Sequence, residues 1–131
     1  MILDTSAVCA VAFDEAEGPA LLERIEAADQ LRISAATVVE LMAVLARSGR
    51  PEVGRRVERL LAAWEVDVAP FDAAQAQVAS QAYRDYGRGS GHRAALNLGD
   101  CYSYALAATA GEPLLFLGDD FPHTDVEVAL R

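Results

Sequence analysis

Short apolar runs alternate with longer segments of helical periodicity along the whole chain. We predict strands at 1–3, 31–34, 66–71 and 114–117, and a final edge strand at 126–130. In the segments between them, apolar positions recur every three or four residues, which predicts helices at 6–13, 19–28, 37–48, 51–64, 72–86 and 101–108. This alternation favours a parallel or mostly parallel sheet with helices on both faces.

Acidic residues stand where the predicted strands end and the predicted helices begin. Asp4 follows the first strand, Glu40 lies in the first turn of the helix expected from Thr37, and Asp100 opens a late helix. Asp119 and Asp120 follow the strongly apolar strand 114–117. In a parallel α/β sheet these positions share one edge, so we expect the acids to converge despite their separation in sequence.

Each acid also has a purely structural interpretation. Glu40 has the spacing of a capping-box partner for Thr37, Asp100 is suited to cap a helix, and one of Asp119 and Asp120 is expected as a turn residue. Asp4 is harder to explain by structure alone, because two hydroxyl residues follow it and are available for capping.

Clustered carboxylates repel one another, and a bound cation is a common compensation. Oxygen ligands favour Mg²⁺ or Mn²⁺, and no paired histidines or thiolate set are present to favour zinc. Cys9 and Cys101 have no metal-binding spacing and are expected to be small buried thiols.

Length and net charge limit the number of domains and the kinds of partner that the chain can have. The 131 residues fit a single domain, 1–131, and the absence of a long apolar run or a basic-led signal peptide predicts a soluble, cytoplasmic protein without membrane contact. A net charge of -9 argues against a generic polyanion binder. It leaves room for a nuclease, because bound metal reverses the local charge.

Four ordered segments carry a resemblance to a known family: 2–7 (ILDTSA), 34–40 (SAATVVE), 96–107 (LNLGDCYSYALA) and 115–125 (LFLGDDFPHTD). Together they resemble the PIN domain and, more narrowly, the VapC toxins of bacterial VapBC toxin-antitoxin pairs. The resemblance implies a three-layer α/β/α fold and a homodimer. It also implies a Mg²⁺- or Mn²⁺-dependent ribonuclease restrained by a VapB antitoxin, in a heterotetramer or larger complex.

The resemblance also implies roles for individual residues. Asp4, Glu40 and Asp100 match the acidic positions of the family, and Asp119 is preferred to Asp120 as the fourth acid because it comes first after the strand and glycine. Asp4, Asp100 and Asp119 would bind metal, with Glu40 as a further ligand or a water-orienting base.

Other residues receive supporting roles. Thr5 or Ser6 matches a hydroxyl that assists at the family's site. The glycine-rich segment 87–93 is expected to be a flexible loop, and Arg84, Arg88 and Arg93 in or beside it are candidates to hold RNA.

Two other functions are consistent with the acids. An aspartate-based phosphatase also has an aspartate after its first strand, although Ser6 stands where such enzymes need a second acid. A non-catalytic binding module would use the acidic cleft to capture an arginine-bearing peptide. For a protein partner, Met42, Leu45 and Trp64 are candidate exposed side chains that would seat an amphipathic helix; the alternative is that they belong to the core.

Overall fold

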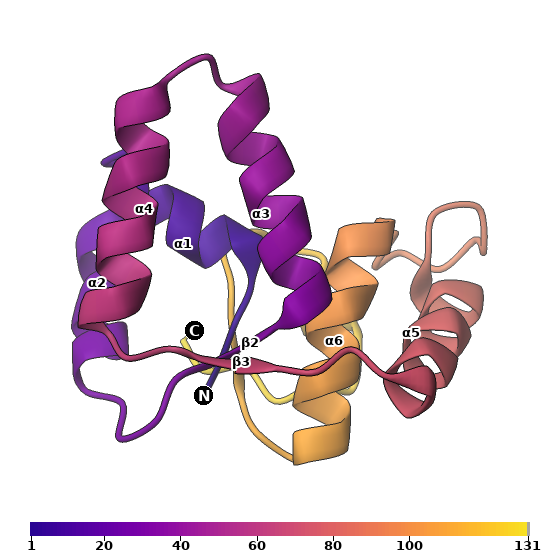
Figure 1. Cartoon of the computed structure of the whole chain (residues 1–131). Coiled ribbons are helices and arrows are strands. Elements are labelled where there is room, and N and C mark those ends of the chain that lie inside the picture. Colours follow the sequence, from indigo (N-terminus) through magenta and orange to yellow (C-terminus); the bar gives the residue numbers. More distant parts are fainter. Residues whose placement is uncertain (131) are drawn as a thin grey trace.

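The structure of the protein, a computed structural model, describes residues 1–130 and is shown in Figure 1. In the described part the strands are β1 (Ile2–Leu3), β2 (Arg32–Ser34), β3 (Asp67–Ala69) and β4 (Leu114–Leu115). The helices are α1 (Thr5–Ala12), α2 (Gly18–Glu26), α3 (Ala35–Arg47), α4 (Pro51–Ala63), α5 (Ala73–Tyr86) and α6 (Leu98–Ala110), with a 3₁₀ turn η1 (Phe121–His123).

The strands form one sheet in the order β3-β2-β1-β4, and every pairing is parallel. The chain first moves outward from β1 to β2 and β3, and then returns past them to place β4 on the other side of β1. This reversal makes a topological switch point between β1 and β4, where ligands of open α/β sheets usually bind.

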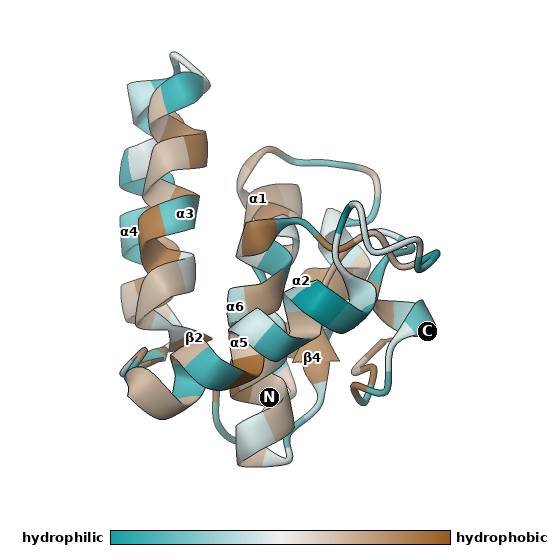
Figure 2. Ribbon diagram, turned by 90° about the vertical axis from the view of Figure 1, so that its right-hand side faces the viewer, coloured by the Kyte–Doolittle hydropathy of each residue, from teal (hydrophilic) through white to brown (hydrophobic). Residues whose placement is uncertain are grey.

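Helices cover both faces of the sheet and confirm the predicted three layers. Successive strand residues alternate between two cores, as a parallel sheet buried on both sides requires. Ile2 and Leu114 enter the core formed with α5 and α6, whereas Leu3 and Leu115 enter the core formed with α1 to α4. The brown colour of β4 in Figure 2 reflects this burial.

Helices α3 and α4 form a hairpin whose far end extends beyond the other helices (Figures 1 and 2). The prediction that Met42, Leu45 and Trp64 form an exposed surface is wrong. Leu45 is buried, and Met42 and Trp64 are partly buried against the same core. These side chains therefore pack against the core beside the hairpin and do not stand out as an exposed surface.

Helix α3 begins earlier than the sequence pattern predicts. Ser34 is its N-cap, and the Ser34 hydroxyl accepts a hydrogen bond from the Ala36 N–H at 3.3 Å. Thr37 and Glu40 consequently lie inside the helix, so the capping-box interpretation of Glu40 is wrong. This leaves the Glu40 side chain without a structural task at its own helix terminus.

The predicted edge strand at 126–130 is reduced to a single bridge between Leu114 and Val128, which is parallel. The N–H of Leu114 donates to the Glu127 carbonyl, and the Ala129 N–H donates to the Leu114 carbonyl. Within residues 1–130, none of the helices is both long enough and apolar enough to cross a membrane.

Candidate active site

Asp4 lies directly after β1, at the carboxyl edge of the sheet. It is the N-cap of α1, and its Oδ2 accepts from the Ser6 N–H at 3.0 Å and from the Ser6 hydroxyl at 2.6 Å. Its Oδ1 accepts from the Ser103 hydroxyl of α6 at 2.6 Å. Asp4 is 3% exposed, so these donors replace the water that a buried carboxylate would otherwise lose. The carboxylate thus caps a helix and is also held in one orientation.

Glu40 projects from the second turn of α3 toward the start of α6. Its Oε1 accepts a hydrogen bond from the Thr5 hydroxyl at 2.5 Å. The other oxygen lies against Gly99, and a Cβ atom at Gly99 would overlap the Glu40 carboxylate. The glycine is therefore what lets the carboxylate approach the N-terminal turn of α6, where the helix dipole favours negative charge.

Asp100 opens α6 in a capping box with Asn97. The Asn97 N–H donates to Asp100 Oδ2 at 2.9 Å, and the Asp100 N–H donates to Asn97 Oδ1 at 2.8 Å. The expectation that Asp100 caps a helix is therefore confirmed for its Oδ2 atom. Asp100 is partly buried, and the charges of other acids act on it.

The charged forms of these acids disfavour one another. Burial raises the pKa of Asp100 to about 7, with further increases from the charges of Asp4, Asp120 and Glu40. The pKa of Glu40 is also raised, chiefly by burial and then by Asp4, although the hydrogen bond from Thr5 opposes this. The charges of Asp4 and Glu40 therefore act on Asp100, and the charge of Asp4 acts on Glu40.

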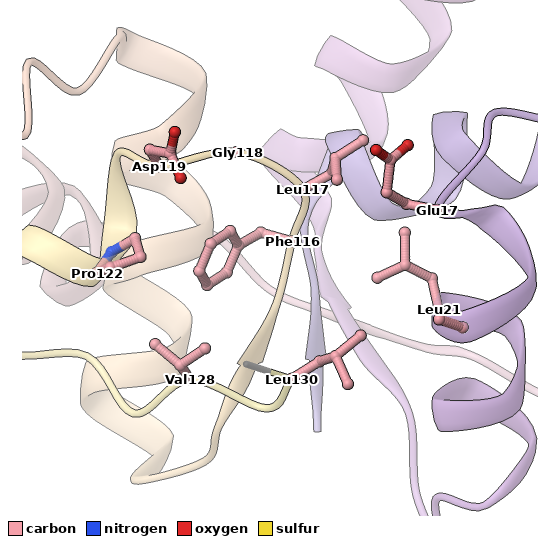
Figure 3. Close-up of a pocket in the computed structure, with 10 residues that line it drawn as sticks. Glu17, Leu21, Phe116, Leu117, Gly118, Asp119, Pro122, Val128 and Leu130 are labelled. Atoms are coloured by element: carbon pink, nitrogen blue, oxygen red, sulfur yellow. The ribbon is translucent and has the colours of Figure 1, made fainter.

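The segment after β4 brings two further acids to this edge. Leu117 donates its N–H to the Ser6 hydroxyl at 3.0 Å, and the same hydroxyl donates to Asp4. Asp119 lies on the rim of an apolar cavity of about 560 Å³ between α2 and the C-terminal segment (Figure 3). Asp120, and not Asp119, is among the charges that raise the pKa of Asp100.

The donor chemistry of these residues fits a hard divalent cation. The acids supply only oxygen ligands, and their repulsion and partial burial favour a compensating positive charge. Within residues 1–130, no three His, Cys, Asp or Glu side chains stand close enough to form a ready metal-binding group. The carboxylates would therefore have to turn toward a cation, and Asp4 is the most firmly held of them.

The candidate RNA-binding arginines divide into two groups. Arg84 hydrogen-bonds to Gln81 on the exposed side of α5, and it stands two residues after Ala82, which is buried in the core that α5 shares with α6. Two helical residues span about 200°, so Arg84 points away from α6. Arg88 and Arg93 are exposed in the loop that leads into α6 and Asp100.

Two residues that support the site were missed by the sequence reasoning. Ser103 looked like one small residue in an apolar helix, and Gly99 like an ordinary residue near a helix start. One signal was available for Ser103, because it stands one helical turn after Asp100 and so shares its face of α6. Nothing local identifies Gly99, because its role depends on Glu40, which is distant in sequence.

Comparison with known families agrees with this geometry. The family model described as the PIN domain matches residues 1–127, so the chain belongs to the PIN-domain family. Within it the chain belongs with the VapC ribonucleases. It is 56% identical over 129 residues to Ribonuclease VapC42 of Mycobacterium tuberculosis, and the alignment covers 98% of each chain. It is 46% identical over 130 residues to Ribonuclease VapC28 of the same species, which covers 99% of this chain and 98% of the relative.

Solved structures give the same fold. The M. tuberculosis toxin VapC20, described as cleaving the sarcin-ricin loop, superposes with a TM-score of 0.75 at 16% identity, over 99% of this chain and 98% of VapC20. VapBC2 from Rickettsia felis, bound to a DNA fragment from its promoter, superposes with a TM-score of 0.72 at 14% identity. The match covers 97% of this chain and 94% of that chain. At these identities the likeness shows the fold alone.

Proposed function

We propose that this protein is the toxin ribonuclease of a toxin-antitoxin pair and that it hydrolyses RNA phosphodiester bonds with the help of a divalent cation, Mg²⁺ or Mn²⁺. The observation that supports the proposal is that Asp4, Glu40 and Asp100, from three separate parts of the chain, lie near enough for the charges of Asp4 and Glu40 to act on Asp100. Membership of the VapC ribonucleases supports RNA as the substrate.

The metal would be held by Asp4, Asp100 and one acid of the segment after β4. When bound, such a cation lowers the pKa of a water molecule and offsets charge on the phosphate. Asp4 keeps a fixed orientation through Ser6 and Ser103. Glu40, with a raised pKa and an oxygen held by Thr5, is suited to take the proton of the attacking water as the bond to the leaving oxygen breaks.

The fourth acid is one of Asp119 and Asp120. The order of residues after β4 favours Asp119, whereas the charge of Asp120 acts on Asp100 and Asp119 lies on the rim of the apolar cavity. We therefore extend the proposal to Asp120 as the stronger candidate. Thr5 and Ser6 act as positioning hydroxyls, for Glu40 and Asp4 respectively.

RNA would approach over the loop between α5 and α6. Arg88 and Arg93 lie in this loop, which ends at the helix start that carries Asp100. Arginine pairs well with phosphate, and a few cations beside an acidic site would offset the repulsion of RNA by a chain of net charge -9. Arg84, on the opposite side of α5, would contribute less.

We also propose a VapB-like antitoxin as the partner. The Rickettsia felis structure is a VapBC complex, and a structure from Klebsiella pneumoniae described as a toxin-antitoxin complex gives a TM-score of 0.64. The acidic surface of this chain favours a basic inhibitor segment. Exposed apolar side chains stand beside the acids in sequence, Val39 at 69% exposure and Leu98 at 59%, and a partner would cover them.

Cleavage of labelled RNA with and without EDTA tests the function. The protein should cut RNA with Mg²⁺ or Mn²⁺ and stop when EDTA removes the metal. A phosphatase would instead release phosphate from a monoester, and a binding module would do neither. RNA cleavage that persists in EDTA would contradict the metal-dependent mechanism.

A further inference from the structure

Two fully buried hydroxyl groups lie where α3 packs against α6. Thr37 and Ser103 are both 0% exposed, and their oxygens are 3.2 Å apart. Thr37 stands one turn before Glu40 on α3, and Ser103 stands one turn after Asp100 on α6. Each hydroxyl therefore lies on the same side of its helix as an acid of the site.

The hydrogen bonds in this pair have a defined direction. A hydroxyl carries one proton, and Ser103 donates its proton to Asp4 Oδ1 at 2.6 Å. At the contact between the two hydroxyls, Thr37 must then be the donor and Ser103 the acceptor. The bonds run in one chain, from Thr37 to Ser103 to the Asp4 carboxylate.

Another hydroxyl on the same helix behaves differently. Thr109 of α6 donates to the Ala105 carbonyl at 2.8 Å, the usual bond to the carbonyl four residues earlier, and accepts from the side-chain amide of Gln75. Among the hydrogen bonds of residues 1–130, the Ser103 hydroxyl instead donates to a side chain, the Asp4 carboxylate, and also contacts the Thr37 hydroxyl of α3. A buried chain of hydrogen bonds costs free energy unless every polar group in it is paired. Ser103 and Thr37 are paired in this way, and the chain ends at the Asp4 carboxylate.

We propose that Thr37 and Ser103 are a positioning pair that orients the Asp4 carboxylate and fixes α3 and α6 relative to it, so that Asp4, Glu40 and Asp100 can meet one cation. Asp4 receives donors on both oxygens, and among residues 1–130 only Ser103 donates to Oδ1. Without Ser103 the carboxylate is free to turn about its Ser6 bonds. This inference rests on the proposed function.

The test uses Mn²⁺ alone as the probe, and the rise in unfolding temperature with Mn²⁺ concentration measures its binding. RNA cleavage is the second readout. Ser103→Ala should weaken Mn²⁺ binding about 10-fold or more, in the range seen when residues that orient metal ligands are removed. Cleavage should show a lower kcat, with the KM for RNA changed by less than about 2-fold, because RNA contacts are untouched.

Thr37→Val and Thr37→Ser form the matched pair. Valine keeps the shape and removes the donor, so Mn²⁺ binding should weaken, whereas serine keeps the hydroxyl and should restore most of it. In a Ser103→Ala background, Thr37→Val should have little further effect on Mn²⁺ affinity, because Thr37 acts through Ser103. Thr109→Val removes a hydroxyl from the same helix and should leave Mn²⁺ affinity unchanged.

A merely structural role predicts a different result. Ser103→Ala and Thr37→Val would then lower the unfolding temperature of the metal-free protein but bind Mn²⁺ as tightly as the wild type, and this would overturn the proposal. If Ser103→Ala does not fold, the comparison of Thr37→Val with Thr37→Ser decides. Failure of the wild type to bind Mn²⁺ and to cut RNA would instead reject the proposed function.

Discussion

Each acid of the site accepts a hydrogen bond that stabilises the fold and also interacts with the charges of the other acids. Asp4 caps α1, Asp100 closes a capping box with Asn97, and Glu40 accepts from Thr5. A residue can therefore be a helix cap and a candidate ligand at once, and finding the cap does not remove the chemistry.

Gly99 allows a prediction that separates stability from activity. Gly99→Ala should displace the Glu40 carboxylate, because the added methyl group would overlap it. Alanine favours a helix over glycine by about 1 kcal/mol, so stability should change little while RNA cleavage falls about 10-fold or more.

Gly54→Ala is the matched control. Gly54 is in α4, and a Cβ atom there would meet no heavy atom within 4 Å. This variant should gain up to about 1 kcal/mol of stability and cut RNA normally. Normal cleavage by Gly99→Ala would contradict the placement of Glu40 in the active site.

A second comparison at this scale distinguishes the two acids after β4. Asp120→Asn should weaken the rise in unfolding temperature caused by Mn²⁺ more than Asp119→Asn does, because the charge of Asp120 acts on Asp100. Thermal unfolding across a Mn²⁺ titration measures both. The reverse order would restore Asp119 as the fourth ligand.

At the scale of secondary structure, the sequence pattern predicted the elements well and their ends less well. The helices and the first four strands were found because apolar periodicity is a strong local signal. The start of α3 was misplaced because Ser34 is both the last strand residue and the N-cap. The segment 126–130 was overpredicted, since its alternation looks like a strand although it forms one bridge.

Glu112 joins the strands at the edge opposite the acids. Its Oε2 lies 2.8 Å from the Met1 ammonium and its Oε1 2.7 Å from Arg32, and the side chain is 24% exposed. The hydrogen bond from the Met1 ammonium, and then that from Arg32, lower the pKa of Glu112 from its ordinary value near 4.5.

A lowered folded-state pKa stabilises the fold at pH values above 4.5, and this contribution is lost as pH falls through the folded-state value. Glu112→Gln should therefore lower the free energy of unfolding by about 1 kcal/mol at pH 7, and the difference from wild type should shrink at acidic pH. Denaturant unfolding of both proteins, with a free N-terminus, at a series of pH values measures this. A difference that is constant with pH would contradict the ion pair.

At the scale of the whole molecule, the site could be predicted only through the fold. The parallel strand order sets the ends of β1 and β2 at one edge, and Asp4, Glu40 and Asp100, which no local pattern joins, come within range of one another's charge. The positions of Gly99 and Ser103 could not be found in this way, because they depend on packing between helices. The surface for a partner was misjudged for the same reason, since helical spacing does not show which side chains a second helix covers.

The overall charge leads to a prediction about the partner. A basic antitoxin co-expressed with this chain should co-purify with it, suppress RNA cleavage and relieve growth arrest, because a chain of net charge -9 attracts a cationic segment to its acids. Light scattering should give a homodimer for the toxin and a heterotetramer or larger for the complex. A complex that cuts RNA as fast as the free chain would rule out inhibition at the acidic site.

The central claim is that Asp4, Glu40 and Asp100 form one metal-dependent site that cuts RNA. The most direct test measures cleavage of labelled RNA by wild type and Asp4→Asn across a Mn²⁺ titration, with circular dichroism of both. Asparagine also caps helices and keeps the shape, so Asp4→Asn should fold normally and lose at least about 100-fold in rate at every Mn²⁺ concentration. Wild-type cleavage by a natively folded Asp4→Asn variant would contradict the account.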